Sequence, residues 1–216
     1  MSSSIAGGGQ FTDCGRRTPP GEIQTLIAGV DEVGRGALFG PVVAAAVILS
    51  ESAVAELQAL GVTDSKRLSH PRRLHLIEPI QTRSIACAIG YASVHEIDRI
   101  NILQASLLAM HRAVGRLSPA PTLCRIDGNQ AIPQLGIPQQ TVIKGDQTDT
   151  AIAAASILAK VWRDQLMVRL DRRYPGYGLA KHKGYGSAEH RRAIQTLGPT
   201  RQHRQSFRGC QLSLDI

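Results

Sequence analysis

The stretch AGVDEVGRG, residues 28–36, joins an apolar segment to two adjacent carboxylates and then to an arginine between glycines. The apolar run that begins at Leu26 is typical of a buried strand. A core strand that ends in Asp31 and Glu32 calls for a reason beyond packing. The rest of the chain has to supply a sheet around this strand and chemical partners for its acids.

Strand-like and helix-like segments alternate along the chain after this strand. The pattern predicts further strands at Gly40–Leu49, Ser84–Val94, Thr122–Asp127 and Thr141–Asp146, and helices at Ser52–Gly61, His70–Gln81, His95–Leu117 and Thr150–Arg172. Ser69 as a cap and Pro71 in the first turn support the second helix. The alternation predicts an α/β fold with a mixed sheet flanked by helices, and the segment after Pro175 predicts a small helical C-terminal cap.

Composition divides the chain into four predicted regions. Residues 1–24 predict a flexible lead-in, 25–174 an α/β domain, 175–209 a basic cap and 210–216 a tail. The longest apolar run, Val42–Leu49, is far shorter than the roughly 20 residues of a membrane helix, and the N-terminus lacks the apolar core of a signal peptide. We therefore expect a cytoplasmic protein without a membrane contact. The four cysteines lack CxxC spacing, which predicts free thiols.

The net charge of +8 is concentrated near the C-terminus. Residues 160–209 carry twelve Lys or Arg against three Asp or Glu, which gives +9 in this segment. Clustered cations favour a polyanionic partner, and nucleic acid is the leading candidate, although charge can also serve solubility alone. Because the whole chain has only three Phe, four Tyr and one Trp, the composition favours a duplex gripped by its backbone over a stacked single strand.

Acidic side chains follow three apolar, strand-like segments. These acids are Asp31 with Glu32, Asp127 and Asp146. Residues just beyond neighbouring strand ends of an α/β sheet can converge in one crevice. Four gathered carboxylates need cations among them to stay ionised, and oxygen-only ligands favour Mg²⁺ or Mn²⁺ over zinc.

Each of these acids also has an ordinary explanation. Aspartate is common where a strand enters a turn, and Asp127 with Gly128 forms a usual turn dipeptide. Asp149 is assigned to capping the long helix that follows it. Asp31 and Glu32 would point to opposite faces of a strand, so either the strand ends there or one of them reaches an ion by a different route.

Six motifs occur in an order and spacing that resemble bacterial type 2 ribonuclease H, the ribonuclease HII family. They are GVDEVGRG, DSKRLS, EIDRINILQAS, IDGN, KGDQTDTAIAAASILAKVWRD and HKGYGS. The resemblance runs from about residue 26 to residue 208 and so spans nearly the whole chain. The family's usual proline is replaced by Ala37 and its usual threonine after GYG by Ser187, and neither change removes a needed group.

The resemblance implies a ribonuclease H-like sheet and hydrolysis of the RNA strand of RNA–DNA hybrids. It also implies nicking on the 5′ side of a single ribonucleotide in duplex DNA, and hence roles in ribonucleotide and RNA primer removal. The acids that match the family's catalytic and metal-binding positions are Asp31, Glu32, Asp127 and Asp146. They would hold two Mg²⁺ or Mn²⁺ ions, one to activate a water and one to stabilise the departing 3′ oxygen.

Further residues match positions that contact the nucleic acid. Gly34 and Gly36 would let the backbone approach a ribose 2′-hydroxyl, and Arg35 between them would meet a phosphate. The ring of Tyr185 would pack against the deoxyribose beyond the junction. The residues expected on backbone phosphates are Ser65 and Lys66, with Lys144, Lys181 and Lys183 as weaker candidates.

The C-terminal tail contains a further motif. Residues Gln211 to Ile216, QLSLDI, resemble the peptide by which bacterial replication proteins dock on the sliding clamp, although six residues recur easily by chance and a frayed tail is the simpler explanation. A non-catalytic nucleic-acid-binding module with the same fold is one alternative to the nuclease. A phosphatase is another, but the sequence has no P-loop. The chain is expected to be a monomer.

Overall fold

The structure is a computed structural model and describes residues 25–210. The predicted lead-in 1–24 and the clamp-like residues 211–216 lie outside this range. No helix within the described range is long and apolar enough to cross a membrane. In that range Cys87, Cys124 and Cys210 are free thiols, as expected.

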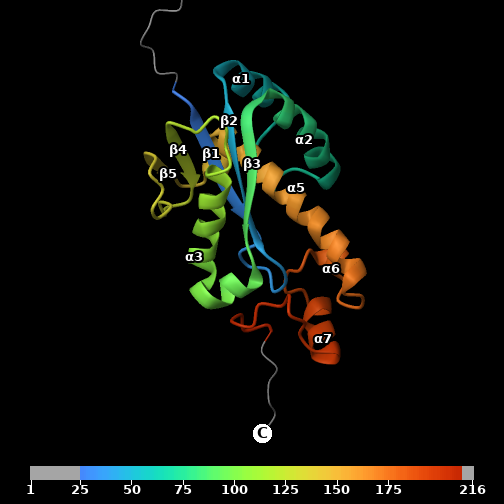
Figure 1. Ribbon diagram of the computed structural model, residues 1–216. Coiled ribbons are helices and arrows are strands. Elements are labelled where there is room, and N and C mark those ends of the chain that lie inside the picture. The colour runs from blue at the N-terminus through green and yellow to red at the C-terminus, as the bar shows by residue number, and fades with distance from the viewer. Residues whose placement is uncertain (1–24, 211–216) are drawn as a thin grey trace, which may run out of the picture.

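A five-stranded sheet in the order β3-β2-β1-β4-β5 forms the centre of the molecule (Figure 1). The strands are β1 (Ile27–Val33), β2 (Val42–Leu49), β3 (Ser84–Ala92), β4 (Leu123–Asp127) and β5 (Gln139–Val142). β1 pairs antiparallel with β2 and parallel with β4, so the sheet is mixed. The central position of β1 explains why its sequence is apolar up to the acids.

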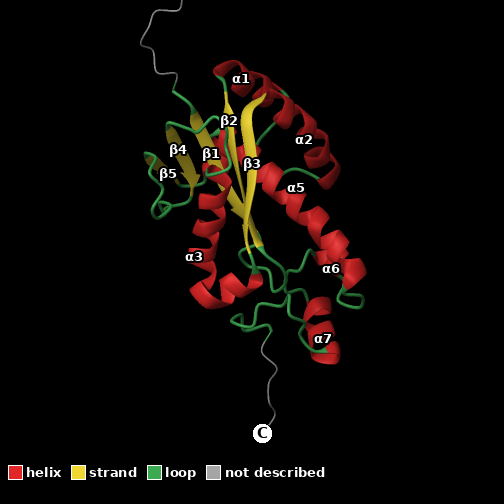
Figure 2. Ribbon diagram, viewed as in Figure 1, coloured by secondary structure: helices red, strands yellow, loops and turns green. Residues whose placement is uncertain are grey.

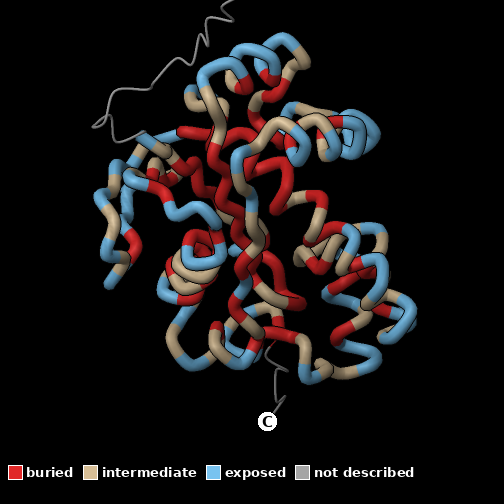
Figure 3. The backbone as a smooth tube through the Cα atoms, turned by 45° about the horizontal axis from the view of Figure 1, so that its top comes forward, coloured by how far each residue is buried: buried red, intermediate tan, exposed pale blue. Residues whose placement is uncertain are grey.

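Helices cover both faces of the sheet (Figure 2). They are α1 (Glu51–Ala59), α2 (His70–Arg83), α3 (Val94–Val114), α4 (Gly145–Thr148), α5 (Thr150–Arg173), α6 (Leu179–His182) and α7 (Ala188–Leu197). Ala44 and Ala46 of β2 pack in the cluster that contains α3, whereas Ala45 and Val47 pack in the cluster that contains α5. Because β2 is buried on both faces, its sequence is a continuous apolar run rather than an alternating one (Figure 3).

The start of α5 lies close against β1. A Cβ atom at Gly29 would lie 2.2 Å from the carbonyl carbon of Ala151, so only glycine permits this approach. The side chain of Asp149 caps the helix by accepting hydrogen bonds from the amides of Ala151 and Ile152, as predicted. The contact between Gly29 and Ala151 fixes α5 along the strand that carries the first two acids.

The segment after α5 packs against the β1–β2 connection rather than standing apart. Phe39 and Met167 share a buried cluster with Leu179 of α6 and Ile194 of α7. Two isolated β-bridges, Ala37 with Tyr185 and Phe39 with His203, join the same regions. The predicted helical cap is therefore placed beside the loop that follows the acids, and the boundary at residue 174 stays a prediction.

The structure corrects the prediction for the region around Asp146. The strand expected over Thr141–Asp146 is instead Gln139–Val142, and Asp146 lies in the short helix α4. Lys144 adopts a left-handed backbone conformation, φ 56°, that turns the chain between them. A smaller difference is a break inside α3, where Asn101 has a non-helical φ of 67°.

Candidate active site

Asp31 and Glu32 lie within β1, which continues to Val33. The strand therefore does not end at the acids, and the two side chains point to opposite faces. Asp31 is 6% exposed, and its carboxylate binds the amide of Glu32 at 2.7 Å and the hydroxyl of Ser156 on α5. Glu32 instead forms an ion pair of 3.3 Å with Arg35.

Asp127 and Asp146 are brought together from β4 and α4. Asp127 is the last residue of β4, the parallel neighbour of β1. Its Oδ1 accepts a hydrogen bond of 2.7 Å from the amide of Gly145, which draws the start of α4 to the strand end. Asp146 follows directly and is 4% exposed.

The electrostatics show that the acids share one neighbourhood. Burial raises the pKa of Asp31 well above its usual value, and the charges of Glu32 and Asp127 raise it further. The pKa of Asp127 is raised by burial and then by Asp146. Burial also raises the pKa of Glu32, against the opposing effect of Arg35. A cation placed among these carboxylates would relieve the repulsion, so this donor set fits a hard divalent ion.

The ligand set itself stays a prediction. Within residues 25–210, no three acidic, histidine or cysteine side chains converge closely enough to hold one ion together in this conformation. Asp31, Glu32, Asp127 and Asp146 are thus close enough for their charges to affect one another's pKa values. Their side chains do not form a complete metal-binding site in this conformation.

One predicted phosphate-binding cation lies among the acids. The Nζ atom of Lys66 is 3.3 Å from Oδ2 of Asp146, although the lysine side chain is 83% exposed. Asp64 holds the backbone of this residue, because its Oδ1 accepts a hydrogen bond of 2.9 Å from the Lys66 amide. The high exposure leaves the ammonium group accessible from solvent.

The other predicted phosphate contacts have varied surroundings. The hydroxyl of Ser65 is buried and lies 2.8 Å from the hydroxyl of Ser156, so it supports Asp31 through a second hydroxyl. Lys144 is exposed. Lys181 forms an ion pair of 2.7 Å with Glu189, and the Nζ atom of Lys183 donates to the carbonyl of Ala180.

Two buried arginines, Arg163 and Arg204, hold the loop that follows the acids. The sequence-based prediction counted both as part of a basic surface, but each is 0% exposed. Arg163 donates hydrogen bonds to the carbonyls of Phe39, Pro41 and Lys183, and Arg204 donates to those of Gly40 and Arg35. Only tertiary structure reveals these contacts, since nothing in the spacing of the residues distinguishes them from surface cations.

The two glycines of the loop differ in their surroundings. Gly34 has a φ of +91°, and a Cβ atom there would lie 2.2 Å from Nε of Arg163. At Gly36, by contrast, no atom of the described residues other than its two chain neighbours lies within 4 Å of the position of a Cβ. The Tyr185 ring lies nearby, because its residue pairs with Ala37 and its centroid is 5.6 Å from the guanidinium carbon of Arg163.

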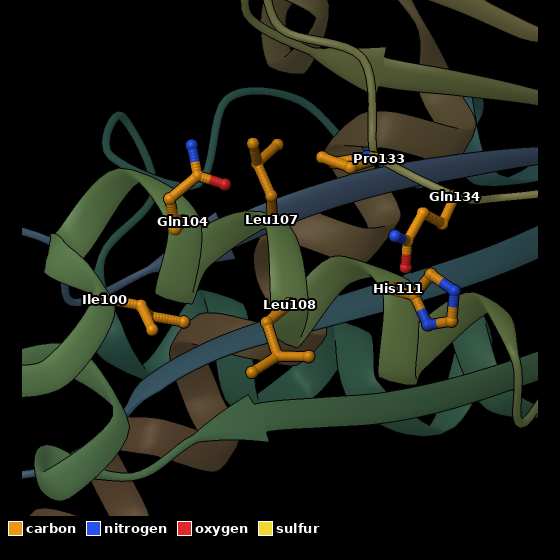
Figure 4. Close-up of a pocket in the computed structure, with 7 residues that line it drawn as sticks. All are labelled: Ile100, Gln104, Leu107, Leu108, His111, Pro133 and Gln134. Atoms are coloured by element: carbon orange, nitrogen blue, oxygen red, sulfur yellow. The ribbon is translucent and has the colours of Figure 1, made fainter.

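A separate pocket of about 330 Å³ lies away from these residues (Figure 4). It is lined by Leu107, Leu108 and His111 of α3 and by Pro133 of the β4–β5 connection. None of the four acids lines it, so the candidate active site is the open surface around the strand ends.

Comparison with known proteins identifies the family. The model of the ribonuclease HII family matches residues 28–210. The chain belongs to the ribonuclease HII family. A ribonuclease HII from Acaryochloris marina is 67% identical over 188 residues, which cover 87% of this chain and 95% of the relative. A ribonuclease HII from Microcystis aeruginosa is 60% identical, covering 89% of this chain and 92% of the relative.

Two solved structures share the fold. The ribonuclease HII of Archaeoglobus fulgidus, solved in a complex with PCNA, has a TM-score of 0.72 at 28% identity and covers 88% of this chain and 98% of its own. The ribonuclease H2 of Pyrococcus horikoshii OT3 has a TM-score of 0.72 at 24% identity, over 86% of this chain and 95% of its own. The predicted ribonuclease H-like mixed sheet is confirmed.

Membership of the ribonuclease HII family also establishes the reaction. The chain is a divalent-metal-dependent endoribonuclease that cleaves the RNA of RNA–DNA hybrids. The prediction of an enzyme, rather than a non-catalytic binding module, is thereby confirmed.

Proposed function

We propose that the enzyme also nicks duplex DNA on the 5′ side of a single ribonucleotide, using two Mg²⁺ or Mn²⁺ ions. The observation that carries this proposal is the placement of the four coupled acids beside a loop with an open glycine and a tyrosine. Such a site can combine cleavage of a phosphodiester with recognition of one sugar. Removal of ribonucleotides from DNA and of RNA primers follows from this specificity.

The four acids would hold the ions, which when bound lower the pKa of a water and stabilise the departing 3′ oxygen. The chain's own contacts orient the carboxylates. Asp31 is fixed by Ser156 and by the amide of Glu32, and Asp127 is fixed by the amide of Gly145. These hydrogen bonds leave the remaining oxygen lone pairs for metal coordination.

The loop of residues 34–36 would recognise the ribose. Arg204 donates a hydrogen bond to the carbonyl of Arg35, and Arg163 holds the chain just after the loop through the carbonyl of Phe39, so the main-chain groups of the loop are pre-organised to hydrogen-bond a 2′-hydroxyl. The open space at Gly36 leaves room for a sugar, and Arg35 would turn from Glu32 to the adjacent phosphate. The ring of Tyr185 would pack on the next deoxyribose and so disfavour a 2′-hydroxyl at that position.

Backbone phosphates would be held by four lysines and by Ser65, whose buried hydroxyl would first have to leave the hydroxyl of Ser156. Lys66, Lys144 and Lys181 are exposed, whereas Lys183 is half-buried. Lys66 would exchange the carboxylate of Asp146 for a phosphate oxygen when metal occupies the acids. Lys181 and Lys183 would first have to leave Glu189 and the carbonyl of Ala180, which makes their contribution smaller.

The decisive experiment compares three duplexes: one with a single ribonucleotide, a long RNA–DNA hybrid and an all-DNA control. We expect metal-dependent nicking 5′ to the single ribonucleotide and no cut in the DNA control. Failure to nick the first duplex while the long hybrid is cleaved would contradict the proposed specificity.

The matched variant for the ion site is Asp127→Asn, which keeps the shape of the side chain. Turnover should fall by orders of magnitude while hybrid binding and thermal stability stay close to wild type, because the ions supply several kcal/mol of transition-state stabilisation. Wild-type turnover in this variant would contradict the proposed role of Asp127 in holding the ions.

We also propose that residues Gln211 to Ile216 dock on the bacterial sliding clamp. The support is their QLSLDI sequence together with the Archaeoglobus fulgidus relative, which was solved with PCNA. Deleting these six residues should weaken clamp binding in a pull-down or titration without changing cleavage of a free hybrid. Unchanged clamp affinity would contradict the proposal. The cytoplasmic location and monomeric state stay predictions, the latter testable by light scattering.

A further inference from the structure

Three histidines of the C-terminal region lie against one another behind Tyr185. The rings of His182 and His190 stack with centroids 4.5 Å apart, and the centroid of His203 is 5.3 Å from that of His190. His190 and His203 are 0% and 1% exposed. They come from α6, from α7 and from the loop after α7 (Figure 1).

Both ring nitrogens of each histidine have a hydrogen-bond partner. Nδ1 of His203 faces the amide of Thr200 at 2.8 Å, and its Nε2 faces Nε2 of His190 at 3.2 Å. Nδ1 of His190 faces the carbonyl of Tyr185 at 3.0 Å. His182 bridges the carbonyl of Tyr177 at 2.7 Å and the amide of Gly184 at 3.2 Å.

These partners fix where the protons are. A backbone amide can only donate, so Nδ1 of His203 carries a lone pair and its Nε2 carries the proton. A carbonyl can only accept, so Nδ1 of His190 carries the proton and its Nε2 carries the lone pair. The two Nε2 atoms are then complementary, donor to acceptor. His182 is fixed in the same way, with its proton on Nε2.

We propose that this array of three neutral imidazoles positions Tyr185 for substrate recognition. It holds the segment from both sides, through the amide of Gly184 and the carbonyl of Tyr185. The inference rests on the proposed contact of the Tyr185 ring with the substrate sugar. The histidines touch no reacting atom, so they are positioning residues.

Every bond of the array requires neutral rings. A proton added to His190 would set two N–H groups face to face at the Nε2 contact, and one added to His203 would oppose the Thr200 amide. Burial lowers the pKa of His190, and it lowers that of His203 to about 4. The titratable and charged groups around the array are Tyr177, Lys181, Glu189 and Arg204.

The test compares His190→Phe, His190→Asn and, as a matched surface control, His75→Phe. Phenylalanine keeps the stacking ring but removes both hydrogen bonds, whereas asparagine can retain the donor to the Tyr185 carbonyl. We expect His190→Phe to lower kcat/KM on the single-ribonucleotide duplex about tenfold relative to the long hybrid, because a small misplacement of a contacting group weakens recognition. His190→Asn should recover part of this ratio, and His75→Phe should leave it unchanged.

A double-mutant cycle with Tyr185→Ala distinguishes a failure of the inference about the histidines from a failure of the proposed role of Tyr185. If the array acts through Tyr185, His190→Phe adds nothing further in the Tyr185→Ala background. Additive losses of kcat/KM in the double variant would overturn the inference about the histidines but leave the proposed role of Tyr185 intact. An unchanged substrate ratio in Tyr185→Ala itself would overturn the proposed role of the tyrosine and the inference with it.

The wild-type protein gives a readout that does not depend on any variant folding. Nitrogen-15 NMR of the histidine rings at neutral pH should show the Nε2–H tautomer for His182 and His203 and the Nδ1–H tautomer for His190. A protonated ring, or the opposite tautomer at His190, would overturn the inference.

Discussion

Gly34 and Gly36 show how two identical residues can be required for different reasons. The protein itself demands glycine at position 34, where φ is +91° and Arg163 occupies the space of a side chain. Nothing within residues 25–210 demands it at position 36, which is exposed and has open space around it. A requirement at Gly36 therefore has to come from a bound partner.

This contrast gives a paired prediction. Gly34→Ala should lower the free energy of unfolding by about 1 to 3 kcal/mol, because alanine is strained at positive φ and would displace Arg163. Gly36→Ala should leave stability within about 0.5 kcal/mol of wild type yet weaken cleavage of the single-ribonucleotide duplex. Urea denaturation and steady-state kinetics measure the two effects. Equal kinetics for Gly36→Ala and wild type would contradict the proposed role of the loop of residues 34–36 in ribose recognition.

The helices and strands that were predicted correctly are those determined by patterns in adjacent residues. The apolar run of β2 and the caps Ser69 and Asp149 identified their strand and helices because the signals lie in adjacent residues. α4 was missed because four residues are too few to form a stable helix alone. Its place depends on the bond between Asp127 and the amide of Gly145, which no local pattern contains.

The residues of the candidate site likewise divide into those that the sequence predicted and those that it did not. The acids were predicted because each follows an apolar run and matches a family motif. The residues that hold the site together, Ser156, Arg163 and Arg204, were missed because their partners are distant in sequence. Their roles follow only once α5 is packed against β1 and the cap against the loop.

The first turn of α3 contains a capping box whose stability should depend on pH. Ser93 and Glu96 cap each other's backbone amides, and Glu96 also pairs with Arg112 at 2.7 Å. This pairing lowers the pKa of Glu96 to about 2. The unfolded state therefore takes up a proton at a higher pH than the fold does, so the stabilisation is present above about pH 4.5 and is lost as the pH falls towards 2.

Glu96→Gln should accordingly lower the free energy of unfolding at pH 7 by about 1 to 2 kcal/mol. The pKa shift alone would give roughly 3 kcal/mol, but the partial exposure of Arg112 screens the pair. Urea denaturation of both proteins should show this difference shrinking as the pH is lowered from 5 towards 2. A difference that is independent of pH would mean that the pair with Arg112 contributes nothing.

For the whole molecule, the positive charge that attracts nucleic acid is smaller than the sequence suggests. Of the cations in residues 160–209, Arg163 and Arg204 are buried against backbone carbonyls. Burial lowers the pKa of Arg204 to about 9, with the charge of Arg163 as a further cause. These two arginines stabilise loops and cannot displace counterions from phosphates at the surface.

Exposed cations near the acids should therefore set the salt dependence of hybrid binding. The logarithm of the binding constant falls by about one per tenfold rise in salt for each phosphate neutralised, so Lys66→Gln should reduce that slope by about one. The matched control is Arg83→Gln, because Arg83 pairs with Glu56 at the end of the sheet where β1 begins, away from Asp31. Titrations of an uncleaved hybrid in Ca²⁺ at several salt concentrations give both slopes. Equal slopes for the two variants would mean that Lys66 neutralises Asp146 and holds no phosphate.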